Sequence, residues 1–163
     1  MGRQMIRDDY LKLTDDELIK LCNIDFYKAT GPGGQKKNKT ESAVRLTLKD
    51  TNISASASEE RQQSVNRTRA LKRLRMQIAM EMREPAVNWD GQWNMNPKNP
   101  EYPAFAACLL DNIFACSWQI STAAENLGVS TGQLIRLLSR HDTIWQYINR
   151  ERQKAGHKPL RKS

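Results

Sequence analysis

Prolines gather in one stretch of the chain and divide it in two. Four of the six prolines lie between positions 85 and 103, together with Trp89 and Trp93. Proline fixes φ and has no N–H to donate, so a regular helix or central strand cannot run through this stretch. We predict a linker at residues 85–103, anchored to a domain surface by its tryptophans, with stacking of these rings on nucleic-acid bases as the alternative.

Before the linker, the apolar pattern changes from the period of a strand to that of a helix. We predict strands at residues 24–29, 43–48 and 53–57, with a turn between the last two. A long helix capped by Ser58 and ending near residue 83 should pack on the sheet through Leu71, Leu74, Ile78 and Met82. The pattern predicts an α+β fold at residues 1–84, with a small mixed or antiparallel sheet and one long packed helix.

A shorter helix is predicted ahead of the first strand, within residues 11–22. Thr14 can cap its N-terminus, and Glu17 three positions on completes a capping box. Its apolar side chains, such as Leu18, should pack on the sheet.

After the linker, the chain predicts a small all-α domain at residues 104–156. Residues 104–117 are apolar on most faces, and residues 120–138 resemble a helix-turn-helix. Gly128 lies at the predicted turn, and Ser130 with Gln133 forms a capping pair. This motif could be a packing unit, an RNA or ribosome contact, or a reader of DNA. Residues 157–163 form a basic tail.

Charge points to a polyanionic partner. The formal net charge is +8 and the pI is near 9.6, which favours nucleic acid. The sequence contains no run of about 18 apolar residues that could span a bilayer, so we expect a cytoplasmic protein with no membrane association.

Cys22, Cys108 and Cys116 lack metal-ligand spacing and should be buried reduced thiols. We expect no metal site and no cofactor, and a monomer.

The most unusual segment is a glycine-rich, cationic loop at residues 31–40, Gly-Pro-Gly-Gly-Gln-Lys-Lys-Asn-Lys-Thr. Glycines without Cβ let a backbone come close to another polymer, and the adjacent lysines suit a phosphate backbone. The spacing does not fit a nucleotide-binding P-loop, because Lys36 and Asn38 stand where the second glycine is needed. An ordinary flexible turn is the other interpretation.

The sequence around this loop resembles the catalytic domain of class-I peptide chain release factors and their stand-alone ribosome-rescue relatives. The hallmark of that family is the Gly-Gly-Gln tripeptide, here Gly33, Gly34 and Gln35. The resemblance covers roughly residues 24–80 and continues through Asn38, Lys39, residues 42–46, Arg61, Gln62, Asn66, Arg67, Ala70, Leu71, Leu74 and Arg75.

The resemblance implies hydrolysis of the ester between nascent peptide and tRNA in the ribosomal peptidyl-transferase centre. Gly33, Gly34 and Gln35 would be catalytic, with the Gln35 N–H stabilising the oxyanion and its side chain orienting water. The family's stop-codon-reading domains find no room in 163 residues. We therefore expect codon-independent release, as in ribosome rescue, with the ribosome and peptidyl-tRNA as partners.

Basic and polar side chains around the loop, on the long helix and in the tail are the candidates for binding rRNA: Lys36, Lys37, Asn38, Lys39, Arg45, Arg61, Arg67, Arg75, Arg161 and Lys162. The alternative for the helix is a solvated face. For the tail it is a solubilising end, in place of the mRNA-channel extension that rescue hydrolases have. Two other functions stay open: a non-catalytic ribosome- or RNA-binding module, and a helix-turn-helix DNA-binding regulator.

Overall fold

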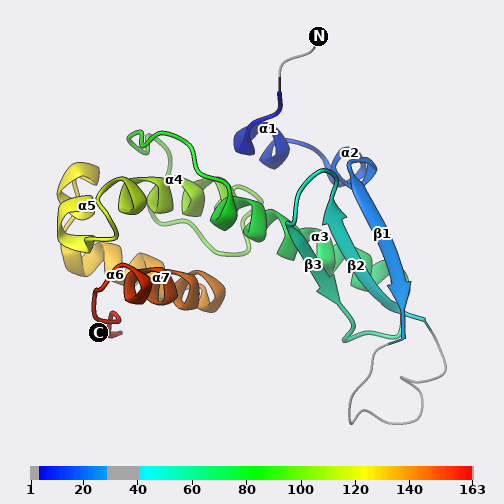
Figure 1. Ribbon diagram of the computed structural model, residues 1–163. Coiled ribbons are helices and arrows are strands. Elements are labelled where there is room, and N and C mark those ends of the chain that lie inside the picture. The colour runs from blue at the N-terminus through cyan, green and yellow to red at the C-terminus, as the bar shows by residue number, and fades with distance from the viewer. Residues whose placement is uncertain (1–3, 29–40, 163) are drawn as a thin grey trace. The chain divides into compact units, whose positions relative to one another are not determined.

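The computed structural model describes residues 4–28 and 41–162, which belong to two compact units, residues 1–81 and residues 82–163. The first unit contains a sheet and helices, and the described part of the second is helical (Figure 1). The predicted α+β class is therefore confirmed.

The first unit builds a three-stranded sheet with one long helix across it. Its elements in chain order are α1 (Arg7–Leu11), α2 (Asp15–Lys20), β1 (Cys22–Tyr27), β2 (Ala43–Leu48), β3 (Ser54–Ala57) and α3 (Gln63–Glu81). The strand order is β1-β2-β3 and both pairs are antiparallel.

The core of this unit lies between the sheet and α3. On β2, Val44, Leu46 and Leu48 share one face by strand alternation, and all three are buried. Opposite them α3 buries a helical stripe that includes Leu74 and Ile78. The predicted β2 bounds and the predicted packing stripe agree with this arrangement, although Met82 lies beyond the end of α3.

β1 is an edge strand of the sheet, and its face is only partly covered. α3 packs on β2 and β3, while α2 contacts β1. Ile24 and Phe26 point to the same face as the β2 core residues opposite them, yet 37% and 45% of their surfaces are exposed. The strand begins at Cys22, two residues earlier than predicted.

The start of α3 is a correction to the sequence prediction. Ser58 does not cap it, and the helix begins at Gln63. The intervening backbone is occupied elsewhere, because the Asn66 side chain accepts a hydrogen bond from the Glu60 N–H and donates one to the Glu60 carbonyl. At the start of α2, Thr14 and Glu17 form the predicted capping box. The preceding helix α1 was not predicted.

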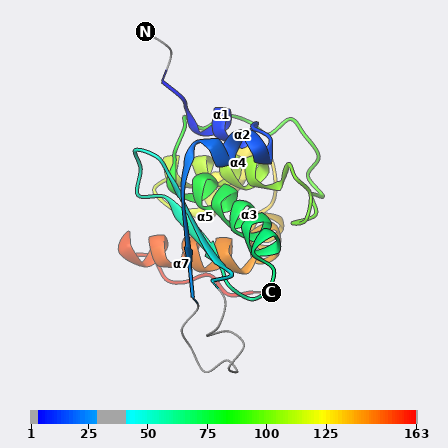
Figure 2. The same cartoon turned by 90° about the vertical axis from the view of Figure 1, so that its right-hand side faces the viewer.

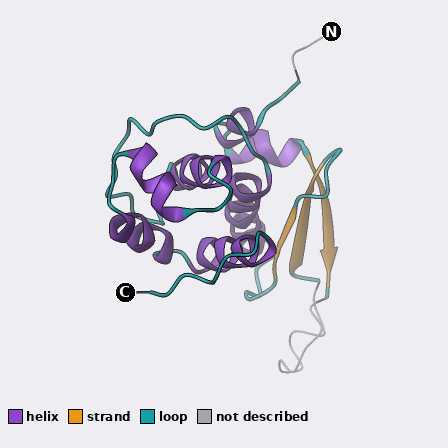
Figure 3. Cartoon of the chain, turned by 60° about the vertical axis from the view of Figure 1, so that its left-hand side comes forward, coloured by secondary structure: helices purple, strands orange, loops and turns teal. Residues whose placement is uncertain are grey.

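Over its described residues, 82–162, the second unit is a long loop followed by helices (Figure 3). The helices are α4 (Tyr102–Ala115), α5 (Ile120–Leu127), α6 (Thr131–Ser139) and α7 (Asp142–Lys154). α4 is buried along most of its length, and α5, α6 and α7 pack in sequence. Within the described residues, none of the helices is long and apolar enough to cross a membrane.

The connection between α5 and α6 follows the predicted chemistry. Gly128 ends α5 in the left-handed region at φ 77°, a conformation that glycine adopts at little cost. The Ser130 hydroxyl accepts a hydrogen bond from the Gln133 N–H at 3.1 Å and caps α6. The predicted turn and capping pair are confirmed.

The long loop is fixed to α4 by aromatic contacts. The rings of Trp89 and Trp93 meet the Phe105 ring edge-on, with centroids 5.1 Å and 5.9 Å away. The Asn112 side chain donates a hydrogen bond to the Val87 carbonyl at 2.9 Å. These contacts explain how a stretch without helix or strand keeps a defined path.

None of the three cysteines, all of which lie in the described residues, forms a disulfide. Cys22 and Cys108 are buried as expected, but Cys116, just after α4, is half-buried and accepts a hydrogen bond from the Asn126 amide. Burial raises the pKa of the Cys22 thiol, which favours its protonated form.

Candidate functional site

The predicted catalytic tripeptide falls outside the described residues. Four predicted RNA-binding residues also fall outside them. The predicted site residues that the structure does not describe are therefore Gly33, Gly34, Gln35, Lys36, Lys37, Asn38 and Lys39. The structure describes the chain up to Lys28 and again from Glu41. The site is therefore built from the residues that hold the two ends of this segment.

Both ends of the segment are held at one end of the sheet. Tyr27, the last residue of β1, pairs with Ala43, the first residue of β2. The pairing is antiparallel, so the chain leaves and rejoins the sheet at neighbouring points (Figure 2). Residues 28–42 thus connect two adjacent strands, and we call Tyr27 and residues 41–43 the root of the segment.

Asn66 holds the root from α3. Its side chain is fully buried, and its amide donates hydrogen bonds to the Ser42 carbonyl at 2.8 Å and the Glu60 carbonyl at 2.9 Å. Its oxygen accepts from the Glu60 N–H at 3.1 Å. One turn earlier, Gln63 donates to the Glu41 carbonyl at 2.9 Å. Two successive backbone carbonyls of the root are therefore fixed by α3.

Arg45 is the predicted RNA-binding residue that lies beside the root. It is exposed on β2, with its guanidinium carbon 4.9 Å from the centre of the Tyr27 ring. This geometry is a cation–π contact, which orients the guanidinium without removing its charge. Asp25 stands opposite Arg45 in the register of the two strands.

The basic residues of α3 divide into exposed and internally paired groups. Arg67, next to the buried Asn66, is exposed, as is Arg61 before the helix. Arg75 is different: its guanidinium donates to the Leu13 carbonyl at 2.8 Å and to the Asp15 carboxylate at 2.9 Å. Only 14% of its side chain is exposed. Its contacts give Arg75 a structural role, and its part in RNA binding stays a prediction.

Two further arginines of α3 are paired with acids. Arg69 contacts Glu60 at 2.9 Å, and Arg73 contacts Glu59 at 2.8 Å. Arg73 also donates to the Ser56 carbonyl on β3. The surplus of cations expected on the helix is therefore smaller than the sequence suggests.

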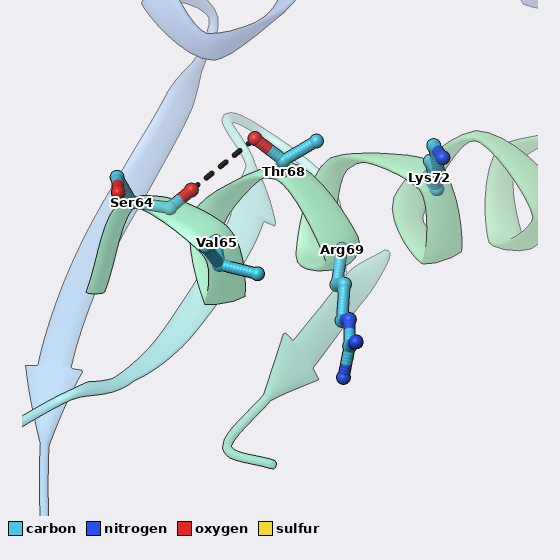
Figure 4. Close-up of a pocket in the computed structure, with 5 residues that line it drawn as sticks. All are labelled: Ser64, Val65, Thr68, Arg69 and Lys72. Atoms are coloured by element: carbon cyan, nitrogen blue, oxygen red, sulfur yellow. Dashed lines mark hydrogen bonds between the residues drawn. The ribbon is translucent and has the colours of Figure 1, made fainter. Parts of the chain in front are cut away.

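A shallow hollow of about 360 Å³ lies along one side of α3, and sequence analysis did not predict it (Figure 4). Its lining residues are Ser64, Val65, Thr68, Arg69 and Lys72. The Thr68 hydroxyl donates to the Ser64 carbonyl at 3.2 Å, so it is already engaged within the helix. Residues four positions apart on one helix lie on the same side of it. This spacing is the signal in the sequence from which the hollow could have been predicted.

Two groups with a shifted pKa lie side by side in the second unit. Burial lowers the pKa of His141, opposed by the charge of Asp142, and the ring stacks on Tyr102 with centroids 5.7 Å apart. Burial raises the pKa of Tyr102 to about 12. In residues 4–28 and 41–162, no three histidine, cysteine or acidic side chains are grouped to hold a metal ion.

Of the two predicted tail residues, Lys162 contacts α7. Lys162 lies 3.7 Å from the Asp142 carboxylate and 5.8 Å from the centre of the Trp145 ring. Arg161 is exposed. They belong to the second unit, whereas the root, Arg45, Arg61, Arg67 and Arg75 belong to the first.

Comparison with known proteins gives matches to part of the chain. Residues 14–94 match the RF-1 domain. The chain is 42% identical over 73 residues to peptide chain release factor 1 of Caldicellulosiruptor saccharolyticus, covering 45% of this chain and 19% of that protein. It is 42% identical over 71 residues to peptide chain release factor 2 of Campylobacter hominis, covering 44% of this chain and 19% of that protein.

A third relative, peptide chain release factor 1 of Acidiphilium cryptum, is 48% identical over 64 residues, covering 39% of this chain and 18% of that protein. The chain thus matches about a fifth of the length of these curated relatives. No solved structure matches it. All of α4 to α7 lies beyond the end of the domain match.

Proposed function

We propose that this chain, which carries an RF-1 domain at residues 14–94, releases nascent peptides by hydrolysing peptidyl-tRNA on the ribosome. The domain match carries this proposal, because it spans Gly33, Gly34 and Gln35. The relatives named above are peptide chain release factors, which supports the same activity.

The chemistry we propose needs no titrating side chain in the loop. The Gln35 backbone N–H donates a hydrogen bond to the oxyanion that develops on the ester carbonyl. The Gln35 side-chain amide orients the attacking water, and Gly33 and Gly34 allow the backbone to approach the ester closely. Peptidyl-tRNA and the peptidyl-transferase centre supply the remaining groups.

The root supports this role by fixing both ends of the catalytic segment. The Tyr27–Ala43 pair and the Asn66 hydrogen bonds hold it against the sheet and α3. The cations proposed to contact rRNA from this unit are Lys36, Lys37, Lys39, Arg45, Arg61 and Arg67, with Asn38 as a polar contact and Arg75 as a cation already engaged inside the fold.

We further propose that release is independent of a stop codon, in the manner of ribosome rescue. The resemblance to stand-alone rescue hydrolases supports this finer assignment. The relevant substrate would be peptidyl-tRNA on a ribosome whose decoding site holds no codon.

The experiment that tests the function measures release of labelled peptide from ribosomes carrying peptidyl-tRNA. One set of ribosomes carries truncated mRNA and the other a stop codon in the decoding site. We expect equal rates on both. A strict need for the stop codon would contradict the rescue assignment, and ribosome binding without any release would favour the non-catalytic RNA-binding module.

Variants of the tripeptide test the residues. Gln35→Ala should lower release modestly, because the backbone donor remains, and Gln35→Pro should lower it further, by ~10²-fold. Gly34→Val should be at least as damaging, since its side chain blocks the approach. Gln153→Ala, at an exposed glutamine of the second unit, is the matched control. Unchanged release in all three loop variants would remove the tripeptide from the mechanism.

A further inference from the structure

The end of α7 reverses the direction of the chain. Gly156 adopts φ 87°, in the left-handed region that favours glycine. The N–H of Gly156 donates to the Gln153 carbonyl at 3.0 Å, and that of His157 donates to the Arg152 carbonyl at 2.8 Å. These two bonds are the Schellman motif that ends many helices. The residues after Gly156 are thereby directed back along α7.

Residues 157–162, which we call the strap, are bonded to α7 at successive turns. The Arg152 guanidinium donates to the Lys158 carbonyl at 3.0 Å, and the Leu160 N–H donates to the Asn149 side chain at 2.7 Å. Further along, Lys162 reaches Asp142 near the start of α7. Later residues of the strap thus contact earlier residues of α7, so the strap lies antiparallel to the helix (Figure 3).

A second attachment fixes the beginning of the strap. The His157 ring nitrogen Nε2 lies 2.9 Å from the Ser117 carbonyl, and Arg152 also donates to the Trp118 carbonyl. Ser117 and Trp118 both have positive φ, 54° and 67°. Their turned carbonyls are therefore satisfied by the same residues that position the strap.

This arrangement displays a set of cations on a fixed backbone. We call the basic face the exposed cations Arg150, Lys158, Arg161 and Lys162. Arg150 lies on the solvent side of α7, away from its buried residues Ile144 and Ile148. Lys154 is not part of this face, because at about 3.6 residues per turn it lies on the side of α7 away from Asn149 and Arg152, which hold the strap. The acid beside these cations is Asp142, 3.7 Å from Lys162.

The aromatic rings of this face already have partners. The Arg150 guanidinium lies 5.6 Å from the centre of the Tyr147 ring, and Lys162 lies over Trp145. Tyr147 also meets Trp118 edge-on at 6.1 Å. Single-stranded nucleic acid is bound through rings that are free to stack on bases. Cations at fixed positions suit instead the regular phosphates of a double helix.

We propose that the basic face binds the phosphate backbone of double-helical RNA, as a second RNA contact separate from the catalytic segment. The choice of RNA rests on the proposed function, which brings the chain to the ribosome. This assignment differs from a free tail in the mRNA channel, because the strap is part of the folded unit.

The test measures binding of the full chain to a labelled 16-base-pair RNA duplex, with no ribosome present. The triple variant Arg150→Gln/Lys158→Gln/Arg161→Gln should lose most of the affinity, and the dependence of log affinity on log salt should become shallower by about 3, one for each phosphate contact. Lys98→Gln, an exposed lysine of the same unit outside the basic face, should bind like the wild type.

Single-stranded RNA of the same length and a DNA duplex of the same sequence are the comparison probes. Equal or tighter binding of either would overturn the assignment, and so would wild-type affinity in the triple variant. Because release is measured separately, a chain that binds the duplex but releases no peptide would disprove the proposed function and leave the RNA-binding face supported.

Gly156→Ala tests whether the folded strap matters as well as its charge. Alanine at φ 87° is strained, so the strap should separate from α7 without any change in charge. We expect weaker duplex binding with the same net charge. Wild-type affinity in this variant, with the strap shown to be detached by hydrogen exchange, would contradict binding by a preformed surface.

Discussion

Asn66 in the first unit and Arg152 in the second perform the same task with different chemistry. Each lies on a helix and holds a non-helical segment by its backbone: Asn66 holds the root, and Arg152 holds the strap. The amide of Asn66 has two donors and an acceptor that match two carbonyls and one N–H, so it is completely buried.

Arg152 carries a charge, and its partners are neutral carbonyl oxygens at Trp118 and Lys158. It is only half-buried, and burial lowers its pKa. The comparison shows that a neutral, fully matched side chain can be sealed inside a core, while a charged one doing similar work stays near water. Substitutions at the two positions should therefore differ in cost.

Changing Asn66 should have the largest effect. Asn66→Asp replaces two donors with an acceptor and buries a charge against the carbonyls of Ser42 and Glu60, which should cost about 4 kcal/mol. Hydrogen exchange of residues 41–81 measures the loss, since all four tryptophans lie in the second unit. Asn23→Asp, at an exposed asparagine, should cost less than about 0.5 kcal/mol. Equal costs would contradict the role of Asn66.

Changing Arg152 should come next. Arg152→Met leaves the Trp118 and Lys158 carbonyls without their donor, at a cost of about 3 kcal/mol in the second unit. Denaturant unfolding followed by tryptophan fluorescence reports this unit alone, because it holds all four tryptophans. Lys154→Met, whose side chain is 65% exposed, is the control. If both variants unfold at the same denaturant concentration, the hydrogen bonds of Arg152 do not contribute to the stability of this unit.

Arg75 sharpens the comparison, because it joins neutral carbonyls and an acid. Arg75→Gln should cost about 2 kcal/mol through the lost bonds to Leu11 and Leu13, whereas Asp15→Asn should cost less than about 0.5 kcal/mol because Asp15 is largely exposed. Hydrogen exchange of the first unit measures the stability lost in each of these two variants. A stable Arg75→Gln variant with weakened ribosome binding would assign Arg75 to RNA instead.

The smallest expected effect is a dependence on pH confined to the second unit. Burial lowers the pKa of His141 in the folded state. Protonation therefore favours the unfolded state, and stability should fall as pH drops below the ordinary value of about 6.5, by less than ~1 kcal/mol. Both histidines lie in this unit. Unfolding followed by tryptophan fluorescence at several pH values measures how the free energy of unfolding changes with pH. The decrease at low pH should disappear in His141→Gln. If the decrease persists in that variant, another group is responsible.

The sequence predicted those features that depend on neighbours within a few residues. The Thr14 capping box, β2 and the turn at Gly128 all follow local patterns, and each was predicted correctly. The release-factor resemblance is likewise supported by the RF-1 match. The catalytic roles of Gly33, Gly34 and Gln35 stay predictions, since these residues lie outside the described part of the chain.

The missed features depend on distant partners. Asn66 holds a carbonyl 24 positions earlier, and Arg75 reaches one 62 positions earlier. An arginine on a helix looks the same in sequence whether it faces solvent or clamps a remote backbone. The strap had a local signal, since Gly156 follows a basic helix end, but its return path along α7 depends on Asn149 and Arg152 together.

The pairing of Tyr27 with Ala43 brings the two ends of the segment together within the first unit. Neighbouring residues across an antiparallel pair are about 5 Å apart, so a short connection can join the two strands. A replacement of residues 29–40 that keeps Glu41 and Ser42, whose carbonyls Gln63 and Asn66 bind, should leave the first unit folded. Segments of other lengths can then be inserted at the same place, so this unit can serve as a scaffold for engineered loops.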